Sequence, residues 1–244
     1  MAENRIITAG ILVIGDEILS GRTKDTNSGY IADYLTAVGI DLKEIRVVAD
    51  EKEAIIGAVR TLSDAYTYVF TTGGIGPTHD DITADCMAEA FGVGIDHNEE
   101  AIAMMKANYP PEIELNEARL RMARIPFGAT LIDNAMRAPP GFRIENVHVM
   151  AGVPTVMRAM LDEIGPTLET GTVIHSRTVP FSRGEGTIAA GLGAIQADFD
   201  DVSIGSYPMI KDGRYMTQIV LRSRDETRLG EAEAAVSKLA ASLS

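Results

Sequence analysis

The sequence predicts an α/β protein with a mostly parallel sheet covered by helices on both faces, followed by a small α+β domain. Two observations lead to this prediction. Short apolar segments alternate with amphipathic segments over residues 5–71, which is the order of a β-α-β-α-β series. A turn-rich stretch, residues 165–171, is followed by a second set of strand and helix patterns. We therefore place one domain at residues 1–168 and a small α+β domain at residues 169–244.

The elements of the first series follow from apolar spacing. Residues 5–14 (RIITAGILVI) form a nearly continuous apolar run with β-branched residues, which is typical of a strand buried on both faces. Apolar residues between 30 and 38 recur at helical spacing, with Asp25 or Thr26 at the expected start and Gly39 at the expected end. The same reasoning predicts a strand at 41–49, a helix from residue 51 and a strand at 66–71.

The remaining elements are predicted in the same way. Helical patterns continue to about residue 123, strand patterns occupy 130–133, 141–145 and 147–151, and a helix begins near Pro154. In the second domain the expected order is strand 172–181, helix 186–197, strands 201–207 and 214–222, and helix 225–241.

Composition excludes several functions. The 244-residue chain is 45% hydrophobic and has a net charge of −13, which opposes sequence-independent binding of nucleic acid. Residues 65–79 form the longest stretch without charged side chains, and its glycines and short length predict no membrane span. With Cys86 alone, no intrachain disulfide forms. The N-terminus has no basic segment typical of a signal peptide, so we expect a cytoplasmic protein.

A glycine-rich turn is the first candidate for binding chemistry. Gly73, Gly74 and Gly76 follow Thr72 at the end of a predicted strand, and Thr83 lies where the next helix begins. Glycines allow positive φ and a close approach of a ligand to backbone N–H groups. Together with a helix N-terminus, such a turn can bind phosphate. It lacks the lysine of a Walker A loop and departs from the dinucleotide fingerprint at its last position.

Carboxylates surround this turn in the sequence. Asp80 and Asp81 follow the glycines, and Asp16, Glu17 and Asp50 follow two other strands that end at the same edge of a parallel sheet. Acids beside a phosphate repel it unless a cation lies between them. We therefore predict a divalent metal such as Mg²⁺, held by Asp81 and Asp16 and by phosphate oxygens, with Asp50 as a third catalytic acid.

Simpler interpretations remain open for single residues. Asp50, Asp80 or Asp81 can cap a helix, and Asp16 and Glu17 can form a solvated turn. Asn27 is either a ligand contact or part of a helix start. A positive segment comprises Arg119, Arg121, Arg124, Arg137 and Arg143. Arg119 or Arg143 is expected to bind an outer phosphate, the alternative being a solvated helix face.

The sequence resembles the MoaB/Mog-type molybdopterin-binding family in the form found in competence/damage-inducible protein A (CinA), and it is similar to the N-terminal domain of eukaryotic FAD synthase. The matching segments are residues 15–19, 26–27, 72–83, 116–122 with Pro126, 138–142, 152–154, 184–186 and 204–208. They cover nearly the whole chain, and the Gly-Gly-Ile-Gly-Pro-Thr-His-Asp-Asp-Ile-Thr block is the most specific of them.

This resemblance implies a three-layer α/β/α domain, a small second domain and a homo-oligomer. It also implies a phosphorylated pterin or a nucleotide at Gly73, Gly74, Gly76, Asp81 and Thr83. CinA-type members are linked to hydrolysis of ADP-ribose or FAD, and Mog-type members adenylylate molybdopterin. The amidohydrolase domain of full-length CinA proteins would be absent, since this chain ends before it.

Three functions follow as hypotheses. The preferred one is a metal-dependent nucleotide pyrophosphatase of the ADP-ribose or FAD class. The others are molybdopterin binding and adenylylation, and a pterin- or nucleotide-binding module without catalysis. Two residues depart from the resembled family, Ala151 where Pro is common and Val156 where Glu is often found, and the departure at Val156 favours the last hypothesis.

Overall fold

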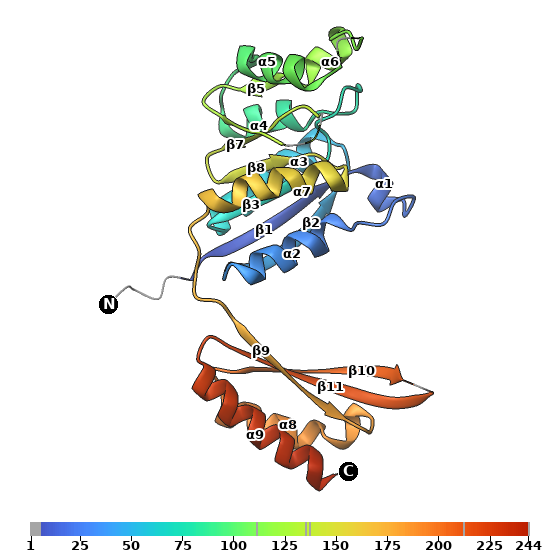
Figure 1. Cartoon of the computed structure of the whole chain (residues 1–244), viewed down its shortest axis with the longest axis vertical. Helices are drawn as coiled ribbons and strands as arrows, with labels where there is room; N and C mark the ends of the chain where they lie inside the picture. Colours follow the sequence, from blue (N-terminus) through green and yellow to red (C-terminus); the bar gives the residue numbers. More distant parts are fainter. Residues whose placement is uncertain (1–5, 111, 135, 137, 212, 244) are drawn as a thin grey trace, which may run out of the picture. The chain divides into compact units, whose positions relative to one another are not determined.

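The computed structural model describes residues 6–110, 112–134, 136, 138–211 and 213–243. The chain divides into two compact units, Met1–Gly171 and Thr172–Ser244, drawn from blue to gold and from orange to red in Figure 1. The sequence placed the domain boundary between residues 168 and 169, within the segment that connects the last helix of the first unit to the first strand of the second.

A six-stranded sheet forms the centre of the first unit. Its order is β2 (Asp41–Val48), β1 (Thr8–Ile14), β3 (Tyr68–Thr72), β8 (Val147–Met150), β7 (Gly141–Ile144) and β6 (Thr130–Ile132). The first four strands are parallel, and β7 and β6 are antiparallel to their neighbours. Strand β1 lies between two parallel partners and is almost wholly buried, as its continuous apolar run predicts.

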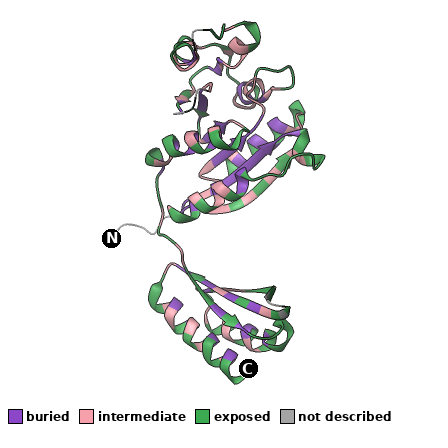
Figure 2. Cartoon of the chain, turned by 45° about the vertical axis from the view of Figure 1, so that its right-hand side comes forward, coloured by how far each residue is buried: buried purple, intermediate pink, exposed green. Residues whose placement is uncertain are grey.

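Helices cover both faces of this sheet. The helices of the first unit are α1 (Asp16–Leu19), α2 (Asn27–Ala37), α3 (Lys52–Ala65), α4 (Thr83–Phe91), α5 (Glu99–Asn108), α6 (Glu117–Arg121) and α7 (Pro154–Ile164), with a 3-10 turn, η1, at Gly165–Thr167. One core packs α3, α4 and α5 against one face, and another packs α2 and α7 against the other. Figure 2 shows the buried residues concentrated along the central strands. The predicted three-layer α/β/α fold is confirmed.

Two local predictions were incomplete. The segment expected to be helical up to residue 123 is interrupted by β4 (Ile95–His97), which pairs with β5 (Arg124–Pro126) in a separate antiparallel ribbon. Three-residue strands carry too little periodicity to be recognised in a sequence. Asp16 and Glu17, interpreted as a turn, begin the short helix α1.

The second unit is a three-stranded antiparallel sheet with two helices. Its elements are β9 (His175–Phe181), η2 (Glu185–Thr187), α8 (Ala189–Asp198), β10 (Ser203–Lys211), β11 (Arg214–Ser223) and α9 (Glu226–Ser242), with sheet order β10-β11-β9. Side chains such as Phe181, Ile219 and Val236 form a core of its own. The predicted α+β domain is therefore present.

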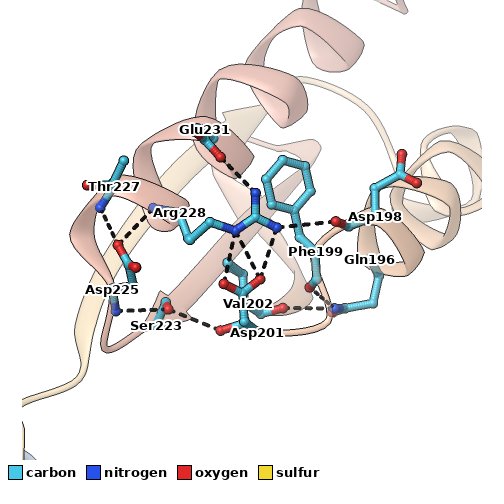
Figure 3. Close-up of polar contacts among 10 residues, drawn as sticks. All are labelled: Gln196, Asp198, Phe199, Asp201, Val202, Ser223, Asp225, Thr227, Arg228 and Glu231. Carbon is cyan, nitrogen blue, oxygen red and sulfur yellow. Dashed lines mark hydrogen bonds and ion pairs between the residues drawn. The ribbon is translucent and has the colours of Figure 1, made fainter.

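A polar cluster joins α8, α9 and the segment before β10 in this unit. Arg228 forms an ion pair with Asp201 at 3.0 Å, donates to the backbone carbonyl of Asp198 and lies 4.5 Å above the ring of Phe199 (Figure 3). Asp225 caps α9 by accepting hydrogen bonds from the first backbone N–H groups of the helix. These contacts fix the start of α9 beside the end of α8.

Within the part of the chain that the structure describes, every helix is too short or too polar to cross a membrane.

Candidate functional site

A cavity of about 490 Å³ opens where β1 and β3 end and the glycine-rich turn begins. This is the edge at which open parallel sheets bind ligands. Its lining combines backbone of the turn, acidic side chains and apolar side chains. The residues are Ile14, Gly15, Glu17, Asp50, Gly73, Gly74, Ile75, Gly76, Pro77, Asp80, Asp81, Met122, Ala138, Pro139, Ala151, Gly152, Val153 and Val156.

A larger hollow, about 680 Å³, lies beside α3, α4 and β4. Its charged lining residues have partners, because Lys52 pairs with Glu89 and Asp85 pairs with Arg124. The acids at the glycine-rich turn lack cationic partners of this kind among the described residues, apart from the exposed contact of Asp80 with His79. Uncompensated charge favours the smaller cavity as the site of chemistry.

The glycine-rich turn has a conformation that other residues cannot adopt easily. Gly73 and Gly74 have φ angles of 106° and 67°. A Cβ atom on Gly73 would lie 2.1 Å from the carbonyl oxygen of Ile14, and one on Gly74 would lie 2.1 Å from Oγ1 of Thr83. The hydrogen bonds of the described residues leave the backbone N–H groups of Gly74, Ile75 and Gly76 without a protein acceptor. The turn therefore presents free donors of the kind that bind phosphate.

Thr83 supports the glycine-rich turn through two hydrogen bonds. Its buried hydroxyl donates to the carbonyl of Gly73 at 3.0 Å, and its backbone N–H donates to the carbonyl of Gly74 at 3.0 Å. Thr83 is therefore a support of the turn and does not line the cavity. Thr72 is buried at the end of β3 and also lies outside the lining.

Asp81 does not cap the following helix. Its Oδ2 accepts hydrogen bonds from the backbone N–H of Thr78 at 2.8 Å and from the hydroxyl of Thr78 at 2.6 Å, which closes the loop over residues 78–81. A Cβ atom on Gly76 would lie 2.6 Å from the same oxygen. The glycine thus makes room for the carboxylate, and the loop holds Asp81 at the cavity.

Asp16 and Asp50 bind each other's backbone. The N–H of Asp16 donates to Oδ2 of Asp50 at 2.9 Å, and the N–H of Asp50 approaches Oδ1 of Asp16 at 3.4 Å. The interpretation of Asp50 as a helix cap is wrong, because α3 begins without a side-chain cap. Asp50 is among the residues that line the cavity, and Asp16 is not.

The environment of Asp50 disfavours its charged form. Burial raises the pKa of Asp50, and the like charges of Asp16, Glu17 and Asp80 raise this pKa further, against the lowering effect of the hydrogen bond from Asp16. A bound cation would relieve this repulsion. The carboxylates therefore fit a divalent metal in the chemistry of their oxygen donors. Over the described parts of the chain, no group of three or more His, Cys, Asp or Glu side chains is placed to hold a metal, so phosphate and water would have to complete its coordination.

Asn27 binds the loop at Gly152, which packs against the glycine-rich turn. Its side-chain amide donates to the carbonyl of Gly152 at 2.8 Å, and a Cβ atom on Gly152 would lie 3.3 Å from Cα of Gly73. Asn27 lines a small adjacent cleft of about 70 Å³ together with Thr72. The helix start nearby is capped by Asp25, which accepts from the N–H groups of Asn27 and Ser28.

The arginines of the positive segment separate in the structure. Arg119 donates to the carbonyl of Glu114 at 2.7 Å, and Arg143 is exposed in β7 opposite His148, so neither is brought to the cavity. Arg137 lies outside the described residues. Among the described arginines of this segment, Arg121, which the sequence did not assign to phosphate binding, donates to the backbone carbonyl of Asp81 at 3.4 Å.

Part of the cavity lining is apolar. Ile14, Ala138, Pro139 and Val153 contribute to it, and Val156 lines the same cavity at a position where the resembled family often has Glu. Apolar lining of this kind is common in sites that bind small molecules. The site thus combines a turn with free backbone donors, acidic side chains and apolar side chains.

Fold and site define an α/β protein with a candidate ligand-binding cavity at the carboxyl edge of its parallel strands. Residues 10–170 match the family described as a probable molybdopterin binding domain, and residues 173–243 match the middle domain of FAD synthase. The chain belongs to this molybdopterin-binding family, in its CinA-like form related to FAD synthase.

Three relatives illustrate the relationship. A protein of Archaeoglobus fulgidus is 34% identical over 89% of this chain and 92% of its own length. A probable FAD synthase of Caenorhabditis briggsae is 30% identical over 95% of this chain, which spans 49% of that protein. The crystal structure of the protein CinA with unknown function from Thermoplasma acidophilum is 33% identical, covers 66% of this chain and 98% of that one, and has a TM-score of 0.62.

Proposed function

We propose that the protein is a metal-dependent pyrophosphatase that cleaves the phosphate–phosphate bond of a dinucleotide of the ADP-ribose or FAD class. The observation that carries this proposal is the meeting of free backbone donors at Gly74–Gly76 with the carboxylates of Glu17, Asp50, Asp80 and Asp81 in one cavity. The donors suit a phosphate, and the acids suit the cation that a pyrophosphate requires. The relationship to FAD synthase, whose named product contains a pyrophosphate, agrees with it.

Asp81 is the first candidate to hold the metal, with Asp16 as the second. One oxygen of Asp81 is occupied by Thr78, and its other oxygen has no described protein donor. A bound divalent ion would neutralise the phosphates and lower the pKa of a water molecule. Asp50, whose pKa is raised, is suited to receive a proton from the attacking water.

The apolar part of the lining and Val156 support a second candidate. Here the cavity binds a phosphorylated pterin, for adenylylation or for binding without turnover. Binding without turnover is favoured by Val156, which places no carboxylate where the resembled family often has Glu. The matching family, described as a probable molybdopterin binding domain, favours this ligand class. Incubation with purified pterin and ATP, followed by analysis for an adenylylated product, tests it.

Cleavage of ADP-ribose, FAD and NAD by the full chain tests the preferred proposal. Each substrate is incubated with Mg²⁺, Mn²⁺, Co²⁺ or EDTA, and AMP release is followed by chromatography. We expect metal-dependent AMP release, lowered at least about a hundredfold in Asp81→Asn. Asn can still accept the Thr78 hydrogen bonds, so this variant should fold. Asp96→Asn, which changes an exposed acid of β4, is the matched control. Normal hydrolysis by Asp81→Asn would refute the assignment.

A further inference from the structure

The side chains that line the cavity carry negative charge that no lining residue described in the structure neutralises. Glu17, Asp50, Asp80 and Asp81 line it, and no lysine or arginine does so among the described residues. A ligand with two linked phosphates brings further negative charge. One divalent ion offsets only part of this charge, so a positively charged side chain next to the cavity would favour binding of such a ligand.

Arg121 is placed to supply that positive charge. It is the last residue of α6 and lines a narrow cleft of about 20 Å³. Gly74, Gly76 and Asp81 line both this cleft and the main cavity. The guanidinium group and the phosphate-binding donors therefore lie around the same turn.

The guanidinium group of Arg121 also has hydrogen-bond donors with a distant acceptor or none. Its Nε is buried and has no hydrogen-bond partner, and Nη2 makes a long bond of 3.4 Å to the carbonyl of Asp81. The neighbouring Arg124, by contrast, makes two bonds of 2.8 and 2.7 Å to Asp85. A buried donor of a charged group destabilises the protein when it has no acceptor. An anion bound beside Arg121 would accept a hydrogen bond and so remove this cost.

We propose that Arg121 binds the second phosphate of a diphosphate-linked ligand and so gives the site its preference for two linked phosphates over one. This inference rests on the proposed function, because it assumes a phosphate at the glycine-rich turn. The planar guanidinium group can make two parallel hydrogen bonds to phosphate oxygens, which the point charge of a lysine cannot reproduce.

Comparison of two ligands in the full chain tests the proposal. Binding of ADP-ribose, in the form of its non-hydrolysable α,β-methylene analogue, and of AMP is measured by calorimetry in the presence of Mg²⁺, for the unchanged protein, Arg121→Gln and Arg121→Lys. We expect Arg121→Gln to weaken ADP-ribose binding at least about tenfold, the loss typical of a charged hydrogen bond. AMP binding should change less than about threefold, and Arg121→Lys should recover part of the loss. Lys106→Gln, an exposed site on α5, controls for the loss of one positive charge.

The outcomes separate this inference from the proposed function. If the unchanged protein binds ADP-ribose without cleaving it, the pyrophosphatase proposal fails, while the ratio of ADP-ribose to AMP affinity still decides the role of Arg121. Equal weakening of both ligands in Arg121→Gln would show that the residue only supports the Asp81 loop, and unchanged binding would show no role. Absence of ADP-ribose binding by the unchanged protein would overturn the inference too.

Discussion

His148 should make the stability of the first unit depend on pH. Its ring is 2% exposed on β8, stacked at 5.1 Å on Phe70 and edge-on to Tyr68, and faces the core shared with α2 and α7. Burial, assisted by the positive charge of Arg143, lowers the pKa of His148 from 6.5 to about 4. The perturbation that tests this is His148→Phe, which keeps an aromatic ring and removes the titrating group.

The direction and size of the change in unfolding free energy with pH follow from the different proton binding of His148 in the folded and unfolded states. The folded state holds His148 neutral, whereas the unfolded chain protonates it near pH 6.5, so its stabilising contribution is complete above that pH and is lost as pH falls toward 4. The full difference is about 3 kcal/mol, of which about 1.4 kcal/mol is lost between pH 8 and about 5.5. The lower of these pH values stays above the isoelectric point of about 4.7, which limits precipitation.

Urea unfolding followed by tyrosine fluorescence measures this effect. The chain contains no Trp, so its fluorescence comes from tyrosines. Tyr207 and Tyr215 lie in the second unit, and the other tyrosines lie in the first unit and report its unfolding. We expect the unchanged protein to lose about 1.4 kcal/mol more than His148→Phe between the two pH values. His97→Gln, at an exposed histidine of β4, should behave like the unchanged protein. Equal pH dependence in the unchanged protein and His148→Phe would refute the reasoning.

Two further predictions concern the glycine-rich turn and its acids. Gly74→Ala should destabilise the first unit by about 1–3 kcal/mol and weaken ADP-ribose binding, because Gly74 has a positive φ and an added Cβ atom would clash with the side chain of Thr83. Thermal unfolding measures the loss of stability, and calorimetry measures the loss of binding. Gly57→Ala, which places a Cβ atom in open space on α3, is the control. Asp50→Asn should raise the melting temperature at pH 8, since Asn keeps the acceptor for Asp16 and removes a repelled charge, while metal-dependent AMP release falls at least about a hundredfold because the proposed proton acceptor is lost. A lower melting temperature, or unchanged AMP release, would contradict the role given to Asp50.

Much of the site could be predicted because it depends on local chemistry. Glycines at 73, 74 and 76 signal a turn that only glycine tolerates, and their positive φ angles and close contacts at Gly73 and Gly74 agree with that signal. Parallel strands end at one edge, so Asp50 could be placed at the cavity from its position after a strand. The same argument could not separate Asp50, which lines the cavity, from Asp16, which does not.

The sequence by itself determined the alternation of strands and helices, the two domains, the glycine-rich turn and the family, because these depend on periodicity and on residues adjacent in the chain. Only the tertiary structure decided which acids line the cavity and which of the described arginines lies next to the Asp81 loop. Arg119, Arg121 and Arg143 are equivalent in a sequence, but α6 turns Arg121 toward Asp81 and the antiparallel β7 places Arg143 beside His148. That choice depends on packing between segments distant in the chain, for which the sequence alone carries no local signal.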